Sequence, residues 1–465
     1  MFRKDFVWGA ASSAYQTEGG DEKDGRGKNV WDTFTEAGKI EEGNNACTAC
    51  DTCHRYKEDF ALMKKLGIRN YRFSINWSRI LPDGTGKVNE KAIRFYRDFL
   101  ISMKENGIKP YLTLFHWEYP QALQNQGGWL NEKSPDWFAN FAKIAAENFS
   151  DLCDTFISMN EPQCFTGLGY VNGIHAPGLK LPLPDTFLLV HNALKANGKA
   201  IQALREYAKQ PITVGYAPTC SAAMPWSENP EDLHSAKPED IEAARQAYFG
   251  FDMLKVHGGM RNWTWNVSWF SDPVILGTYP EDGLKRFAKY LPKITDKDMD
   301  LIHRKLDFYG QNIYNGYPVR MGENGKPQPV PRKWGYPRTA AGWPVTPEAL
   351  YWGPKFLCER YQLPFYITEN GTCCTTDKIA LDGKVHDPDR IDFLHRYIRN
   401  LRTAAEEGAD IRGYFHWSFT DNFEWNEGYS KRFGLVYMDY ETQKRTPKDS
   451  ALWYRDVIRT NGKNL

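Results

Sequence analysis

The sequence predicts an α/β fold, a single-domain (β/α)8 TIM barrel with elaborated βα loops. Eight short runs rich in β-branched and aromatic residues recur along the chain, and each is followed by a loop and then a helical pattern. No tract rich in Pro, Gly and Ser divides the 465 residues. Because barrels of alternating strands and helices often reach this length as one unit, residues 1–465 are expected to form one domain.

The predicted strands are nearly continuous in apolar character instead of alternating, as expected for parallel strands covered on both faces. Eight such strands suffice for a closed barrel. They are predicted at Phe6–Ala10, Asn70–Ser74, Pro110–Leu114, Phe156–Asn160, Ile212–Tyr216, Phe308–Asn312, Phe365–Thr368 and Gly413–Trp417.

The connection between the first two strands shows the helical pattern. Phe60, Met63 and Leu66 recur at a spacing of three, and Gly67 follows at the position where helices stop. A helix that packs on the barrel is therefore predicted over 58–67. The segment 322–342, rich in Pro, Gly and basic residues, is predicted to be a long loop after the sixth strand.

The bulk composition narrows the class of partner. Lys and Arg total 59 against 58 Asp and Glu, so no net charge favours nucleic acid, an anionic membrane or a polyanionic substrate. No apolar stretch has the length of a signal peptide or a membrane span, and nine cysteines fit reduced thiols. We expect a soluble, cytoplasmic protein with a neutral small-molecule substrate. The sequence leaves open whether the chain forms a homo-oligomer.

Two glutamates stand at the same end of the predicted barrel. Glu161 follows the fourth strand and Glu369 follows the seventh. In such barrels the working residues lie at the carboxyl ends of the strands. Glycoside cleavage needs one carboxyl group that protonates the leaving oxygen and another that stabilises or attacks the anomeric carbon. This pair of residues therefore predicts glycoside chemistry, although strand position alone does not say which carboxyl has which role.

Several motifs resemble glycoside hydrolase family 1. The segments Asn160-Glu161-Pro162 and Ile367-Thr368-Glu369-Asn370-Gly371 resemble the two active-site motifs of that family. The resemblance covers essentially the whole chain in family order, and it implies a (β/α)8 fold, a retaining mechanism and no cofactor. Further matching segments are Phe6 to Gly19, Tyr71 to Arg79, Phe423 to Trp425 and Lys431 to Gly434.

The resemblance assigns roles to individual residues. It makes Glu369 the nucleophile and Glu161 the acid/base, with Arg72, Asn160 and Tyr314 as catalytic support. A nearby cation such as Arg72 favours the ionised form of the nucleophile, whereas the acid/base needs burial or the field of Glu369 to hold its proton. The residues implied to bind the sugar are Gln16, His116, Trp117, Asn312, Trp417, Glu424, Trp425 and Phe433. His175 recurs in the family and is expected to be structural, and no firm contact is assigned to Trp334 or Trp343.

The activity implied by the resemblance is that of a retaining β-glycosidase, a β-glucosidase that releases terminal non-reducing β-D-glucosyl residues from oligosaccharides or aryl and alkyl glycosides. Broad β-galactosidase or β-fucosidase specificity and transglycosylation through the same site remain alternatives. Family members that cleave 6-phosphoglycosides typically carry Ser in place of Glu424 and Tyr in place of Phe433, so the sugar is expected to be unphosphorylated. The presence of both carboxylates argues against a sugar-binding protein without activity.

Three cysteines at a spacing of three, Cys47, Cys50 and Cys53, precede His54 and resemble part of a metal-binding run. A fourth cluster cysteine and a closing proline are absent from this run, so we interpret these residues as thiols without a metal. No metal and no cofactor are expected.

Overall fold

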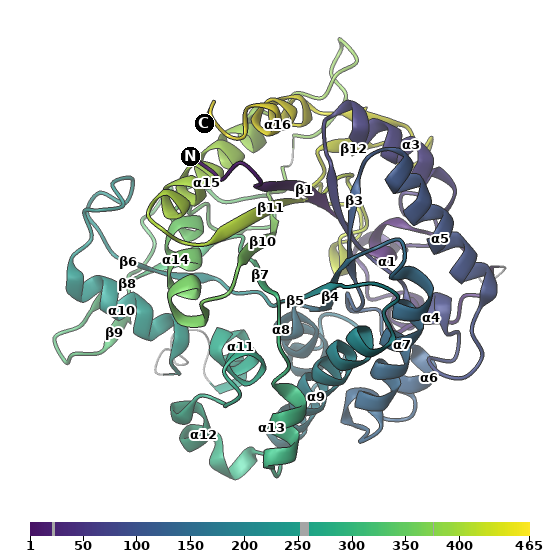
Figure 1. Ribbon diagram of the computed structural model, residues 1–465. Helices are drawn as coiled ribbons and strands as arrows, with labels where there is room; N and C mark the ends of the chain where they lie inside the picture. The colour runs from purple at the N-terminus through teal and green to yellow at the C-terminus, as the bar shows by residue number, and fades with distance from the viewer. Residues whose placement is uncertain (21–23, 252–259, 375) are drawn as a thin grey trace.

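Eight parallel strands form a closed barrel in the computed structural model, which describes residues 1–20, 24–251, 260–374 and 376–465 (Figure 1). Around the barrel the strand order is β1-β11-β10-β7-β5-β4-β3-β2. The strands are β1 Val7–Ala11, β2 Asn70–Ser74, β3 Lys109–Thr113, β4 Thr155–Asn160, β5 Thr213–Ala217, β7 Phe308–Asn312, β10 Phe365–Asn370 and β11 Ile411–Trp417.

The structure confirms the predicted (β/α)8 barrel and each of its eight strands. The strand ends differ from the prediction by one or two residues; β11, for example, begins at Ile411 because this residue already pairs with Phe365 of β10. The strands are buried along nearly their whole length, which explains why their sequences do not alternate between apolar and polar residues.

Long helices surround the barrel and connect successive strands (Figure 1). The predicted helix before β2 is α3. It ends at Lys65, and Gly67 two residues later adopts the left-handed conformation (φ 71°). The helices between strands are α3 Thr52–Lys65, α5 Glu90–Glu105, α7 Ser134–Phe149, α9 Leu183–Tyr207, α10 Pro238–Phe249, α11 Val267–Ile275, α12 Glu281–Phe287, α13 Asp296–Ile302, α14 Ala349–Tyr361, α15 Pro388–Glu406 and the C-terminal α16 Asp449–Thr460.

Helix α5 shows how these sequences form helices against the barrel. The side chain of Asn89 accepts a hydrogen bond from the amide of Lys91 and so caps the first turn. Ile93, Tyr96 and Leu100 recur at spacings of three and four and are all buried. Each such side chain contributes about 1.5–3 kcal/mol when it leaves water, so one apolar face holds the helix on the barrel.

The βα loops contain further structure. A three-stranded sheet is formed by β6 (Ala222–Pro225), β8 (Gly316–Met321) and β9 (Pro327–Pro329), beside α10 in Figure 1. Because β9 pairs with β8, the prediction of a loop over 322–342 is wrong in part. A second small sheet pairs β12 (Val436–Met438) with β13 (Arg445–Pro447). Short helices in these loops are α1 Ala14–Thr17, α2 Val30–Glu36, α4 Trp77–Ile80, α6 Gln121–Gln124 and α8 Pro162–Cys164.

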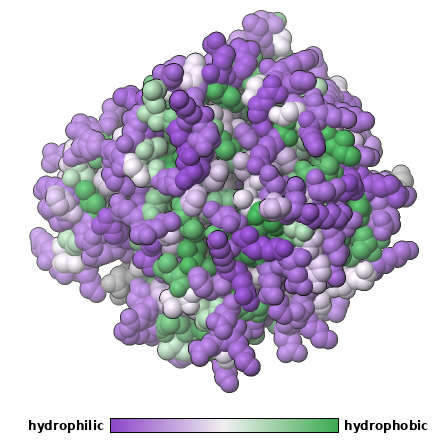
Figure 2. Space-filling model, viewed as in Figure 1, coloured by the Kyte–Doolittle hydropathy of each residue, from purple (hydrophilic) through white to green (hydrophobic). Residues whose placement is uncertain are grey.

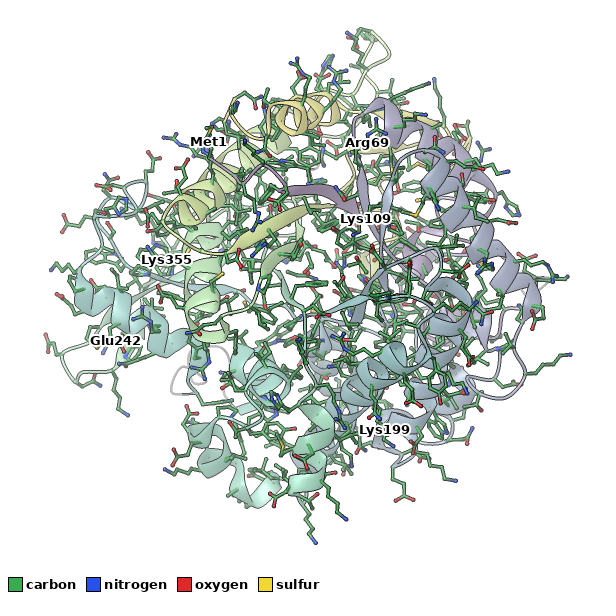
Figure 3. The ribbon with its side chains drawn as sticks, viewed as in Figure 1. Met1, Arg69, Lys109, Lys199, Glu242 and Lys355 are labelled. Atoms are coloured by element: carbon green, nitrogen blue, oxygen red, sulfur yellow. The ribbon has the colours of Figure 1, made fainter. Side chains whose placement is uncertain are left out.

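The two termini lie close together (Figure 1), where Nε1 of Trp8 donates a 2.9 Å hydrogen bond to Oδ1 of Asn461. Arg69 and Lys109, labelled in Figure 3, mark the amino ends of β2 and β3, opposite the predicted site. The face shown in Figure 2 is mainly hydrophilic with scattered hydrophobic residues. Among the described residues, no helix is both long and apolar enough to cross a membrane.

Candidate active site

The two predicted catalytic carboxyl groups lie in one cavity at the carboxyl end of the barrel. Glu161 directly follows β4 and Glu369 lies near the end of β10. Both side chains line a cavity of about 560 Å³, although only 5% and 3% of the two residues is exposed. Such burial perturbs the protonation of both groups, so their hydrogen-bond partners decide what each can do.

Glu369 has partners that stabilise a negative charge. Arg72, fully buried on β2, donates from its guanidinium to Oε1 of Glu369, and the hydroxyl of Tyr314 donates to Oε2 across 2.8 Å. Burial raises the pKa of Glu369, while the charge of Arg72 and the hydrogen bonds from Tyr314 and Arg72 oppose the rise. The geometry therefore favours an ionised carboxylate at this position.

Glu161 has the opposite environment. Burial, followed by the charge of Glu369, raises the pKa of Glu161 to about 7, while hydrogen bonds from Cys164 and Asn312 oppose this shift. The bond from Nδ2 of Asn312 to Oε1 of Glu161 measures 2.7 Å. One carboxyl can therefore hold a proton near neutral pH while its neighbour is ionised. This division is the one that a general acid and a nucleophile require.

Two buried asparagines connect the carboxyl groups. Oδ1 of Asn160 accepts a 2.6 Å hydrogen bond from Arg72 and a 3.0 Å bond from Asn312. Nδ2 of Asn160 lies 3.2 Å from Nε2 of His116. The hydroxyl of Thr368, beside Glu369, donates to Oδ1 of Asn312 across 2.6 Å. The polar network thus fixes the two carboxyl-bearing strands relative to each other from behind the cavity wall.

The residues predicted to bind the sugar surround the same cavity in most cases. Glu424 lies among the lining residues, and Nε2 of Gln16 lies behind it, 3.4 Å from Oε2. Burial and the charges of Glu369 and Glu161 raise the pKa of Glu424 to about 8. Gln16, Arg72, Asn160 and Asn312 do not line the cavity itself, whereas the other predicted members that do so are His116, Trp117, Tyr314, Trp417, Trp425 and Phe433.

The backbone is unusual at three cavity residues. Trp117, Glu161 and Trp425 have positive φ angles of 84°, 44° and 54°, a region that residues with a Cβ atom rarely occupy. Such conformations persist only where the surrounding structure enforces them, and they are often found at functional sites. Here each one turns a side chain at the end of a strand or in a loop toward the cavity. Nothing in the sequence signals these angles.

The cavity is also lined by residues that were not predicted to bind the sugar. His175, expected to be structural, lines the cavity and also packs on Trp31 and Trp117. Burial lowers the pKa of His175 to about 4. Trp343 lines the cavity, whereas Trp334 is fully exposed. The remaining lining residues are Cys164, Leu168, Ile174, Thr219, Cys220, Ser221, Trp265, Asn315, Ala341, Pro344, Asn426, Glu427 and Lys431.

Most of these residues come from βα loops, whose conformation has no periodic sequence signal. Cys164 is an exception. It is the last residue of α8 and stands three residues, about one helical turn, after Glu161. Its amide donates to the carbonyl of Glu161 across 3.0 Å. This i, i+3 spacing is a signal that could have placed its thiol beside the carboxyl group.

The cysteine-rich segment has the features of ordinary structure. Cys50 is buried and its thiol donates to the carbonyl of Asp421, whereas Cys47 is exposed. The ring of His54 contacts Asp51 at 2.6 Å. Within the part of the chain that the structure describes, no three His, Cys, Asp or Glu side chains are grouped so that they could hold a metal ion.

A (β/α)8 barrel that holds two buried carboxyl groups with contrasting partners in one cavity at its carboxyl rim has the arrangement of a glycosidase active site. Comparison with known proteins gives the family. The model of the family described as "Glycosyl hydrolase family 1" matches residues 1–463. The chain belongs to glycosyl hydrolase family 1.

Similar proteins match over their full length. The chain is 41% identical to Beta-glucosidase A of Thermotoga maritima over 99% of this chain and 98% of the relative. It is 39% identical to the 1,4-beta-D-glucan glucohydrolase of Thermotoga neapolitana over 99% of both chains. Among solved structures, the β-glucosidase from T. maritima in complex with glucoimidazole matches with a TM-score of 0.87, 41% identity and 99% coverage of both chains.

Proposed function

We propose that this protein is a retaining β-glucosidase in which Glu369 is the nucleophile and Glu161 the acid/base. The observation that carries the proposal is the contrast between the two carboxyl groups in one cavity. Arg72 and Tyr314 stabilise the charge of Glu369, whereas burial and the neighbouring charge of Glu369 keep the proton on Glu161. The double-displacement mechanism needs this contrast at its start.

In the first step, Glu161 donates its proton to the glycosidic oxygen as the bond from that oxygen to the anomeric carbon breaks. A carboxylate oxygen of Glu369 bonds to the anomeric carbon, and the alcohol leaves. The negative charge of Glu369 is then lost, which removes one cause of the raised pKa of Glu161. Glu161 can now accept a proton from water, whose oxygen attacks the anomeric carbon and releases Glu369 and the sugar.

We infer that the substrate is a neutral β-glucoside. Aromatic side chains such as Trp417 and Trp425 line the cavity and can stack on the CH faces of a sugar ring, and Glu424 can bind its hydroxyl groups. Relatives named Beta-glucosidase A and 1,4-beta-D-glucan glucohydrolase support glucosides, including cello-oligosaccharides, as the substrate class. A panel of nitrophenyl glycosides will compare glucoside with galactoside and fucoside, and product analysis at high substrate will separate hydrolysis from transglycosylation.

The assignment of the two glutamates is tested by azide rescue. Glu369→Gly should abolish turnover of an activated aryl β-glucoside, and azide should restore it with the α-glucosyl azide as product, because azide attacks from the side of the missing nucleophile. Glu161→Ala should instead yield the β-glucosyl azide, since the glycosyl-enzyme still forms. If the two products are exchanged, the assigned roles are wrong. If wild-type protein turns over no β-glucoside, the proposed activity itself is wrong.

We also propose a cytoplasmic location, supported by the buried thiols of Cys50, Cys153, Cys164, Cys220 and Cys373. Thiols persist in reducing compartments, whereas oxidising compartments favour disulfides. Cell fractionation with an antibody against the chain tests this, and recovery of the protein outside the cytoplasm would contradict it.

A further inference from the structure

Beside the cavity, six ionisable side chains form a network that we call the ionic cluster. Its members come from the loop after β10, from α15, from the loop after β11 and from the residue before α16. Five of the six side chains are 0% exposed, and Arg432 is 19% exposed. The cations are Arg390, Arg432 and Lys448, and the anions are Asp377, Asp387 and Asp421.

The ionic cluster is one continuous chain of contacts. Arg390 donates to Asp387 and, across 2.7 Å, to Oδ2 of Asp377. Nζ of Lys448 donates to the same oxygen of Asp377 at 2.6 Å and to Oδ1 of Asp421 at 2.7 Å. Oδ2 of Asp421 then accepts a 2.9 Å bond from Arg432. Three positive and three negative side chains are therefore balanced within a buried volume.

The ionic cluster also holds the backbone of two cavity walls. Nε of Arg390 donates to the carbonyl of Thr372 across 3.4 Å. Thr372 stands three residues after Glu369 in the chain. Nη2 of Arg390 donates to the carbonyl of Arg432 across 2.8 Å, and Oδ1 of Asp421 accepts from the amide of Gly434 across 2.8 Å. Arg432 and Gly434 flank Phe433, which lines the cavity.

Stability alone does not explain such a cluster. Removing several charges from water costs about as much as their mutual attraction returns, and apolar replacements of similar volume are often neutral or stabilising. What an ionic network supplies is a defined geometry, because each charge must meet its partner in one arrangement. Here that geometry joins the segment after Glu369 to the segment that carries Phe433, and Asp421 stands three residues before Glu424.

We propose that the ionic cluster is a positioning device that fixes the wall bearing Glu424 and Phe433 against the strand end bearing Glu369. This inference rests on the proposed function, since it assumes that the sugar is held between these walls. No member of the cluster lines the cavity. Its members act through the cavity residues, so that a sugar ring bound by Glu424 presents its anomeric carbon to Glu369 in one position.

The test removes one cation and one anion together. Lys448→Met with Asp377→Asn leaves two positive and two negative members, which limits the cost of an unpaired buried charge. Because small misplacements of reacting groups are costly, kcat/KM for an aryl β-glucoside should fall about tenfold or more. Affinity for glucoimidazole should fall in parallel, and the midpoint of thermal unfolding should change little.

A control is the pair Arg360 and Asp272, 2.6 Å apart between α14 and α11 and outside the cavity, in which Asp272 is buried and Arg360 is partly exposed. Arg360→Met with Asp272→Asn also removes one cation and one anion and should leave kcat/KM and glucoimidazole affinity unchanged. Ser450→Ala is a milder variant that keeps every charge and removes a 2.5 Å hydrogen bond to Asp387. It should lower kcat/KM about threefold, whereas a purely structural role would lower the melting temperature and leave kcat/KM unchanged.

Wild-type kinetics in Lys448→Met with Asp377→Asn would overturn the proposal, as would an equal kinetic loss in the control. If the double variant does not fold, the kinetics of Ser450→Ala decide in the same way. Wild-type protein is assayed first, so the two hypotheses fail separately: an inactive wild type contradicts the proposed function, whereas an active wild type with an equally active variant contradicts only the role of the ionic cluster.

Discussion

The hydroxyl of Tyr314 donates a 2.8 Å hydrogen bond to Oε2 of Glu369, and Arg72 donates to the other oxygen of the same carboxylate. Both oxygens of the proposed nucleophile therefore have a fixed donor. Each donor stabilises the ionised form and orients the carboxylate toward the cavity. The contribution of Tyr314 can be separated from that of Arg72, because its ring can be kept while its hydroxyl is removed.

Tyr314→Phe should lower kcat/KM for an aryl β-glucoside about 10- to 100-fold, the effect of losing one hydrogen bond to a charged group. The acid limb of the pH profile should also move to higher pH, because the Tyr314 bond lowers the pKa of Glu369. Tyr454→Phe is the control, since the Tyr454 hydroxyl donates to the carbonyl of Gly9 outside the cavity. An unmoved acid limb in Tyr314→Phe would contradict this role.

The alkaline limb of the pH profile of kcat/KM should report the titration of Glu161. This carboxyl must be protonated for the first step, and its pKa is raised to about 7. The value of kcat/KM should therefore fall as the pH rises through about 7, although the two coupled carboxyl groups titrate as a pair. In Glu369→Gln the neighbouring charge is absent, so the pKa of Glu161 should fall. A carbon-13 NMR titration of labelled glutamate measures this shift directly, and an unchanged pKa would mean that the charge of Glu369 does not act on Glu161.

The sequence predicts the barrel because its strands are buried on both faces and leave continuous apolar runs. It predicts that Glu161 and Glu369 share a rim because parallel strands end on the same side. The roles of the two carboxyl groups come from the family resemblance, and their partners supply a physical reason. The positive φ of Trp117 and the ionic cluster have no such signal, because they depend on loop conformation and on contacts between segments far apart in the chain.

Glu118 offers a test of stability independent of catalysis. It is 1% exposed, and its carboxyl oxygens have no hydrogen-bond partner on another residue in the described part of the chain. Burial raises the pKa of Glu118 well above its ordinary value, and the charge of Glu18 adds to this, so the folded protein keeps the proton. Unfolded chains release it above about pH 4.3, so this group lowers the free energy of unfolding by about 1.4 kcal/mol per pH unit until the folded pKa is reached.

Glu118→Gln removes this titration while keeping the size of a neutral side chain. Urea unfolding at pH 5 and pH 7 should show that the variant loses less stability with rising pH than the wild type. Glu132→Gln, a change at an exposed position, should keep the wild-type dependence. Equal pH dependence in Glu118→Gln and the wild type would show that Glu118 does not hold its proton in the folded state.

The choice between a free and a phosphorylated sugar should depend on Glu424. Glu424 offers a phosphate no positive charge and repels it when ionised, while the nearby cation Lys431 lines the same cavity and is engaged with Glu427 at 3.2 Å. The double change Glu424→Ser with Phe433→Tyr removes the repulsion and adds a hydroxyl donor. It should lower kcat/KM for an aryl glucoside and raise it for the 6-phosphoglucoside. Phe433→Tyr alone keeps the carboxylate, so its ratio of the two values should stay near that of the wild type; if the double variant shows the same ratio as well, Glu424 does not select against phosphate.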